Sequence, residues 1–204
     1  SVHVQHGQGI DIQCAGNITI GRQLAYSRLR CAGSVTVGNI DNPMGNLFAC
    51  DIISQDKVEA GTLGAISGST LQVDFSPGFN LLIERKEALD ELLRQIRENN
   101  SKHKEKINIL KSKKVPKELK AKVADALEMF NNEFALLEWI ESKVLEVKET
   151  KDRYHSDIKL IANKRLYPGV SAKLNNRAWR SDREYDRSRV KFEGHQWSCE
   201  PMIS

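Results

Sequence analysis

The first 80 residues alternate apolar and polar positions in short runs broken at glycines, a pattern typical of β-strands joined by tight corners. Within them, the ten residues 12–21 return 17 positions later at 29–38, and the two copies read IQCAGNITIG and LRCAGSVTVG. Strand-like runs that hinge at a glycine and recur after about one coil are typical of a stacked β-solenoid. The pattern therefore predicts parallel coils of β-structure over residues 1–80.

The repeat continues in a third, more divergent copy at residues 52–61, which begins 23 positions after the second. The additional residues predict a longer loop around 42–46, and Asp56 replaces the glycine of the hinge. Residues 71–75 then alternate as a last strand should. If the copies stack, their inward side chains form one core, which we expect to hold Ile12, Cys14, Ile18, Ile20, Leu29, Cys31, Val35, Val37, Ile52 and Val58.

Residues 81–162 change to a helical period. Positions spaced alternately by three and four residues are apolar at six of nine sites between 82 and 110, and at ten of twelve between 119 and 158. This is a sustained heptad seam. Pro116 separates the halves, since a helix tolerates proline in its first turn but not in its interior. The simplest structure is an antiparallel coiled-coil hairpin that turns near residues 113–116.

Residues 163–204 return to β-type sequence. Tyr167-Pro168-Gly169-Val170 combines a turn signal with the start of a strand, and residues 190–194 alternate. Trp179 and Trp197 are suited to cap a β core. We therefore expect 163–204 to complete the coils of residues 1–80, with 81–162 as an insertion. The predicted fold class is mixed β and α, a parallel β-solenoid interrupted by a helical hairpin.

Composition sets limits on this architecture. The chain has 204 residues, of which 40% are hydrophobic and 28% charged, enough for one or two domains. No apolar run approaches the roughly 20 residues of a membrane span, and no signal peptide is recognisable. Because the chain begins inside patterned sequence without a methionine, we expect a fragment of a longer cytosolic protein.

Four cysteines contribute no recognisable motif. They include no C-x-x-C pair, and Cys14 and Cys31 occupy the same place in successive copies. We expect these two to stack as small buried hydrophobes. A metal site or a disulfide are the alternatives.

The charge is concentrated in one segment. Residues 164–191 hold nine basic and three acidic residues, a net +6, against +4 for the whole chain. Such a strip can bind an acidic protein, a phospholipid surface or a nucleic acid. Alternatively, it is a solvated face with local pairs such as Arg183 with Asp182 or Asp186. The candidate partner-binding residues are the arginines of this strip and two lysines of the predicted helical turn, namely Arg177, Arg180, Arg183, Arg187, Arg189, Lys113 and Lys114.

Catalytic motifs are not recognisable in the sequence. The segment 61–64 lacks the remainder of a phosphate-binding loop, and the spacing of His3 and His6 fits no standard zinc pattern. His103 and Asn100 fall on the heptad seam, where polar residues more often set helix register. We therefore predict no catalytic residues, no metal site and no cofactor.

The order of these features resembles the flagellar assembly protein A family of bacteria. The residues that carry the resemblance are 15–21, 32–38, the heptad insertion from about 82 to 160, Tyr167–Val170 and the ending Cys199–Met202. The resemblance implies a right-handed parallel β-helix, an additional N-terminal domain and no catalytic residues. It also implies a cytoplasmic protein needed for flagellum assembly or its placement at the cell pole.

Three function classes follow. The first is a non-catalytic scaffold that presents its β surface and coiled-coil arm to protein partners, with self-association through the ends of the coils or the helices. The second is a module that binds nucleic acid or an anionic surface through the basic strip, although no recognition motif supports nucleic acid. The third is an enzyme of the β-solenoid type, which would need a deep pocket with convergent polar groups.

Overall fold

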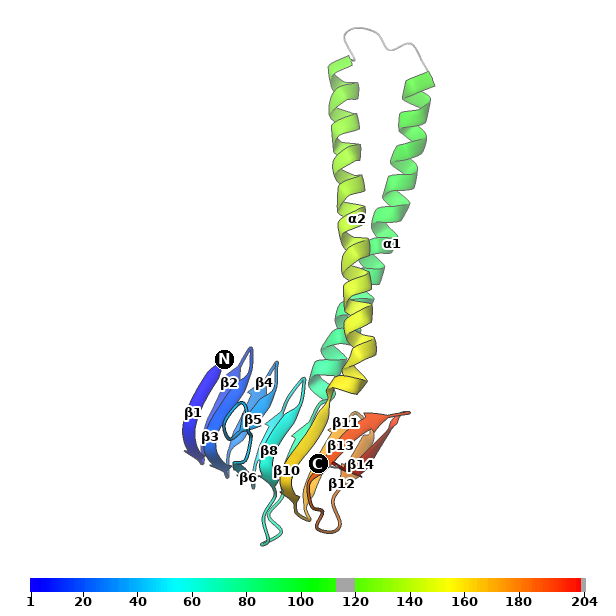
Figure 1. The fold of residues 1–204 in the computed structure, drawn as a ribbon. Coiled ribbons are helices and arrows are strands. Elements are labelled where there is room, and N and C mark those ends of the chain that lie inside the picture. Colours follow the sequence, from blue (N-terminus) through cyan, green and yellow to red (C-terminus); the bar gives the residue numbers. More distant parts are fainter. Residues whose placement is uncertain (113–119, 203–204) are drawn as a thin grey trace. The chain divides into compact units, whose positions relative to one another are not determined.

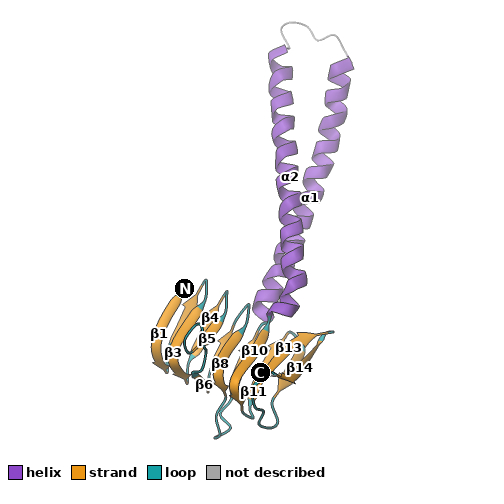
Figure 2. Cartoon of the chain, viewed as in Figure 1, coloured by secondary structure: helices purple, strands orange, loops and turns teal. Residues whose placement is uncertain are grey.

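Short strands and two long helices make up the computed structural model, which describes residues 1–112 and 120–202 (Figure 1). These residues divide into two units. One unit, here the β unit, comprises residues 1–81 with those from 152 onward, and the other, the helical unit, comprises 82–151. The helices are α1 (Ser76–Ser112) and α2 (Lys120–Asp157). Figure 2 distinguishes the helices from the strands by colour.

The strands are short, as expected for runs of apolar and polar alternation that end at glycines. In chain order they are β1 (Val2–Gln8), β2 (Asp11–Cys14), β3 (Ile18–Ala25), β4 (Arg28–Cys31), β5 (Val35–Val37), β6 (Asn46–Phe48), β7 (Asp51–Ile53), β8 (Val58–Leu63), β9 (Leu71–Asp74), β10 (Lys159–Leu166), β11 (Val170–Leu174), β12 (Arg177–Arg180), β13 (Ser188–Glu193) and β14 (Gln196–Pro201).

The strands form two sheets, and the chain passes back and forth between them. The first sheet has the order β1-β3-β5-β8-β10-β13-β14, with β6 pairing to β3 and β8, and the second has the order β12-β11-β9-β7-β4-β2. Pairing is parallel from β1 to β11, whereas β10–β13, β13–β14 and β11–β12 pair antiparallel. A parallel neighbour requires a crossover, and here a strand of the other sheet supplies it. The result is a stack of coils with antiparallel strands at its C-terminal end.

The register confirms the alignment of the three sequence copies. Ile12 pairs with Leu29, which pairs with Ile52. In the other sheet, Ile18 pairs with Val35, and Val35 with Val58. The offset of 17 residues is therefore one coil. The longer offset to the third copy arises because a loop between β5 and β6 lengthens that coil.

Stacked inward side chains form the core, as predicted for eight of the ten candidate residues. These eight are buried, and burial of such side chains supplies about 1.5–3 kcal/mol each. Ile12 and Cys14 differ because they are half-buried. They lie on β2, the edge strand of its sheet, where a neighbour covers one side.

The two helices are inserted between successive coils of the β unit. Before the insertion the chain forms β8 and β9, and after it β10 pairs with β8 and β11 with β9, both in parallel. The return to β-structure begins at Lys159, four residues before the predicted boundary at 163. The reason is tertiary, because Ile158, Leu160 and Ala162 are completely buried in the core although position 158 also fits the heptad pattern.

Tyr154 fixes the ends of the helices within the β unit. Its hydroxyl donates a buried hydrogen bond of 2.7 Å to the carbonyl oxygen of Phe75, and its ring lies 5.5 Å from that of Phe79. At the start of α1, the Asp74 carboxylate accepts a 2.8 Å hydrogen bond from the Ser76 amide, which satisfies one free N–H group of the first turn. The first turn of α1 and the last turn of α2 therefore belong to the β core.

The predicted heptad seam follows the less exposed side of both helices. Every described seam position between 82 and 151 is buried or half-buried. Arg97 contacts Glu141 at 2.7 Å, and His103 contacts Glu133 at 2.7 Å. Residue numbers rise along α1 as they fall along α2 in these contacts, so the helices run antiparallel. The predicted turn near 113–116 lies outside the described residues.

The four cysteines are all free. Cys14 and Cys31 are adjacent in the register of β2 and β4, which confirms their predicted stacking. Cys50 is buried at the corner before β7, and its thiol donates to the carbonyl oxygen of Phe48 at 3.1 Å. Burial raises the pKa of Cys50 to about 11.

This raised pKa predicts slow alkylation of Cys50 in the folded protein. A pKa of about 11 leaves roughly 0.1% thiolate at pH 8, whereas an unperturbed thiol is about one quarter ionised there. We expect iodoacetamide to label Cys50 at least ~100-fold more slowly in native protein than in guanidinium chloride, as read by peptide mass spectrometry. Equal rates in the two conditions would contradict the burial of this thiol.

Candidate protein-interaction surfaces

The arginines of the predicted basic strip are exposed but lie on different elements. Arg177 and Arg180 belong to β12 of the six-stranded sheet, and Arg189 belongs to β13 of the eight-stranded sheet. Arg183 and Arg187 lie in the connection between these strands. Arg180 pairs in register with Ser171 of β11 in the six-stranded sheet. Arg189 pairs in register with Ile161 of β10 in the eight-stranded sheet. The arginines are therefore divided between two sheets, and Arg177, which pairs with the buried Leu174, lies on the opposite side of β12 from Arg180. Lys113 and Lys114 lie outside the described residues.

The acidic residues of the strip do not neutralise these arginines as predicted. Glu184 and Asp186 lie 2.9 and 3.9 Å from Arg165 instead. Arg183 lies over the ring of Tyr185, with its guanidinium carbon 5.0 Å from the ring centroid. Neither Asp182 nor Asp186 forms an ion pair with Arg183 within 4.0 Å, since the connection from β12 to β13 is bound to β10 through the bridge between Tyr185 and Leu166. Among the described residues, the candidate arginines form no ion pair within 4.0 Å.

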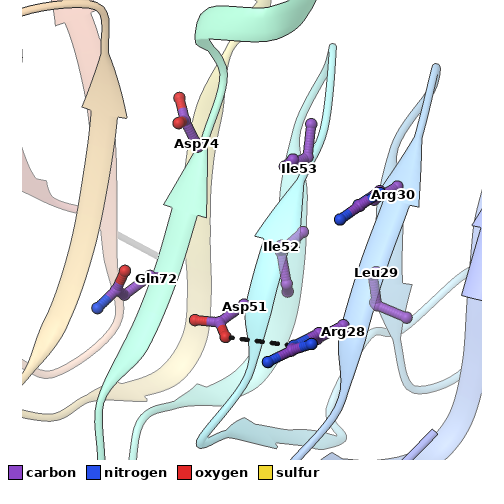
Figure 3. Close-up of a pocket in the computed structure, with 8 residues that line it drawn as sticks. All are labelled: Arg28, Leu29, Arg30, Asp51, Ile52, Ile53, Gln72 and Asp74. Atoms are coloured by element: carbon purple, nitrogen blue, oxygen red, sulfur yellow. Dashed lines mark ion pairs between the residues drawn. The ribbon is translucent and has the colours of Figure 1, made fainter. Parts of the chain in front are cut away.

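A second charged surface, which the sequence analysis did not single out, lies on the outer face of the six-stranded sheet (Figure 3). It surrounds a shallow hollow of about 370 Å³ across β4, β7 and β9. The residues that line it are Arg28, Leu29, Arg30, Asp51, Ile52, Ile53, Gln72 and Asp74. The alternation Arg28-Leu29-Arg30 was the available signal, because alternate residues of a strand face opposite sides.

The charges of this hollow are weakly paired. Arg28 and Asp51 are 4.0 Å apart, with 71% and 64% of their side chains exposed, so water screens their attraction. Figure 3 shows the dashed line between them, and Arg30 one step further along β4. Asp74 lies 3.5 Å from Lys173 of the next coil. The hollow is therefore open and polar, and its charges are only partly paired.

Aromatic side chains cover the C-terminal end of the β core. Trp179 pairs in register with the buried Ala172, and Trp197 pairs with the buried Phe192, so both indoles lie on the inward side of edge strands. The Trp197 ring is 5.1 Å from that of Phe192, and its Nε1 donates to the Arg177 carbonyl oxygen at 3.1 Å. These contacts support the predicted capping role of the two tryptophans.

The helical unit exposes large apolar side chains outside its seam. They are Leu92 and Ile109 on α1 and Met129, Phe134, Leu136, Trp139 and Leu145 on α2. A hollow of about 230 Å³ lies between the helices, next to Met129 and Phe130. Large apolar residues that are exposed in one contiguous patch commonly mark interaction sites. The heptad seam accounts for the period of the helices without these residues, so the sequence pattern did not single them out.

Polar residues interrupt the seam at the positions noted in the sequence. His103 contacts Glu133, and Asn100 is buried with no hydrogen-bond partner for its Nδ2 among the described residues. An unpaired buried amide costs about 1–3 kcal/mol, so Asn100 makes this part of the seam less stable than an apolar residue would.

No group of three or more histidine, cysteine, aspartate or glutamate side chains is arranged to hold a metal ion within residues 1–112 and 120–202. None of the described helical segments is long and apolar enough to cross a membrane.

The fold and these surfaces define a protein of stacked β-coils with a helical insertion. The chain belongs to the Flagellar Assembly Protein A family, since the model of the Flagellar Assembly Protein A beta solenoid domain matches residues 1–197. The resemblance inferred from the sequence is thereby confirmed. Membership places the chain in a family named for flagellar assembly. No curated protein and no solved structure matches the chain.

Proposed function

We propose that this chain is a non-catalytic scaffold for assembly of the bacterial flagellum and for its placement at the cell pole. It acts in the cytoplasm as a right-handed parallel β-helix interrupted by an antiparallel coiled-coil hairpin. Family membership supports the flagellar role. The hairpin and the outer β faces are the surfaces that receive protein partners.

One observation carries the scaffold proposal, namely that the coils resume in register after the insertion. Val58 pairs with Leu160 and Leu71 with Val170 across it. A long helical segment that is not needed to complete the β core has another use. Binding a partner is the use that fits its exposed apolar side chains.

The proposed contact residues are the exposed arginines Arg177, Arg180, Arg183, Arg187 and Arg189, with Lys113 and Lys114 of the turn predicted from the sequence. Arginine suits this role because its planar guanidinium binds carboxylates in two-pronged fashion. We also propose self-association, through the ends of the coils or through the helices. The division of the arginines over two sheets does not favour a continuous strip for nucleic acid or an anionic surface.

Removal of the helical unit should abolish function while leaving the β-coils folded. The variant replaces residues 82–151 by a short glycine-serine linker, which keeps Phe79 and Tyr154 in place. We expect cooperative unfolding of the purified protein, together with loss of flagella or of their polar position in a flagellated host. Electron microscopy of cells and circular dichroism of the protein measure the two results.

A matched control places the same linker in the exposed loop after β8, replacing residues 65–68 and leaving the helices intact. This control should support normal flagellation. Normal number and position of flagella in cells that carry the variant without residues 82–151 would refute the proposed role of the hairpin.

A further inference from the structure

The exposed apolar side chains of α2 are not scattered, because three of them follow a second heptad repeat. Met129, Leu136 and Trp139 each immediately precede a seam residue, so they lie along one flank of the helix. They are 66%, 46% and 56% exposed. Asp125, Asn132 and Lys143 continue the same spacing. The name α2 stripe is used below for these six residues, Asp125, Met129, Asn132, Leu136, Trp139 and Lys143.

We infer that the α2 stripe binds the α2 stripe of a second copy of this chain, with the two helices antiparallel about a two-fold axis near residue 134. This inference rests on the proposed role of the hairpin as an interaction arm, and it names one partner. A two-fold axis perpendicular to a helix necessarily reverses the direction of its copy. Each residue of the stripe then meets a residue equally far from the axis on the other side.

The centre of the stripe is mainly apolar, and its two outer apolar residues match each other under this operation. Met129 lies opposite Trp139 of the second copy, and Asn132 lies opposite Leu136. The exposed indole therefore gains an apolar partner on each side of the axis, and methionine adapts well to an aromatic surface. Every apolar residue of the stripe loses water at once, which is the main favourable contribution to such an interface.

The charges that flank the centre are also self-complementary. Asp125 lies opposite Lys143 of the second copy, and one step further out Lys122 lies opposite Glu146. Within one chain, Lys143 pairs with Glu146 at 2.5 Å. This ion pair is on the exposed surface of the helix, where such pairs contribute little to stability, so it competes weakly with the pairs between copies. Asp125 forms no ion pair among the described residues. A parallel arrangement would instead place each charge opposite its own copy, so the charge pattern selects the antiparallel pairing.

The other flank of α2 lacks this symmetry, which provides a control. Leu145 is 56% exposed, the same fraction as Trp139, but lies outside both the seam and the stripe. On α1, the exposed Lys102 and Lys106 border the same side of the helical pair. Their flexible side chains can keep their charge in water while the α2 stripe is covered.

The test is the mass of the purified chain in solution, measured by light scattering and sedimentation over a range of concentrations. We expect a species of twice the 23.1 kDa of one chain. Trp139→Glu should weaken the dimer by at least about 30-fold, as for an aromatic residue at the centre of an interface. Leu145→Glu should leave the dimer unchanged, and the circular dichroism spectrum should verify that both variants keep their helices.

A charge exchange tests the orientation. Asp125→Lys and Lys143→Asp should each weaken the dimer, whereas the double variant should restore it, because the opposite charges still meet across the axis. A monomer at every concentration overturns the inference, as does a dimer that survives Trp139→Glu or a double variant without recovery. Such results leave the hairpin deletion experiment unaffected, so the two proposals can fail separately.

Discussion

Replacing Leu160 by alanine should lower the free energy of unfolding by about 3 kcal/mol, the usual cost of a cavity at a fully buried leucine. Leu160 is 0% exposed and pairs with Val58 on one side and Val190 on the other. Its side chain therefore contacts both the parallel coils and the antiparallel strands that follow them. Neighbouring strands are held by their own hydrogen bonds, so the cavity cannot close easily. Urea unfolding followed by tryptophan fluorescence measures the change.

Leu145→Ala is the matched control for this prediction. It makes the same chemical change at an exposed helix position, and should alter stability by no more than ~0.5 kcal/mol. Equal effects of the two substitutions would mean that the first strand after the insertion does not complete the core. In that case the helices would not be an insertion within one β-structure.

Gly61→Ala should be the second strongly destabilising change, with a cost of about 2 kcal/mol from overpacking. A Cβ atom at residue 61 would lie 2.5 Å from the main-chain carbonyl of Met44, which belongs to the loop between β5 and β6. Main-chain atoms cannot rotate away, so the loop itself must shift. Thermal unfolding of the purified variant measures the loss.

Gly16→Ala provides the comparison, because it alters another glycine of the same repeated phrase. The nearest atom to a Cβ at residue 16 is the Ser1 nitrogen at 3.5 Å, which is an ordinary contact. The change should be close to neutral, within ~0.5 kcal/mol. If both glycines tolerate alanine equally, the close approach of the loop to β8 is not present in solution.

The β-coils were predictable because their signal is local and repeated. Each copy carries the same alternation, and parallel strands with matching patterns can stack in one register without turning a core residue outward. The register of Leu29 against Ile12 and Ile52 follows from this alone. The return to β-structure was predicted at residue 163, four residues later than the observed start at Lys159, because a residue such as Ile158 fits both a heptad and a strand. Its burial is decided by the strands on either side.

The candidate surfaces were less predictable, because proximity in sequence does not determine which way a side chain faces. Arg180 and Arg189 are close in the chain but belong to different sheets. Arg28 and Asp51 are far apart in sequence, yet adjacent coils bring them to 4.0 Å. The α2 stripe had a readable signal in the spacing of Met129, Leu136 and Trp139. It was overlooked because the stronger seam beside it explains the helix by itself.

The sequence by itself determined the repeat, the period of the helices and the family, since each depends on residues that recur at short and regular spacing. Only the tertiary structure decided which glycine a loop approaches, where the coils resume and which charges meet. Those outcomes depend on pairs of residues brought together from distant coils. Their energies arise from packing and desolvation at the contact, which no local pattern encodes.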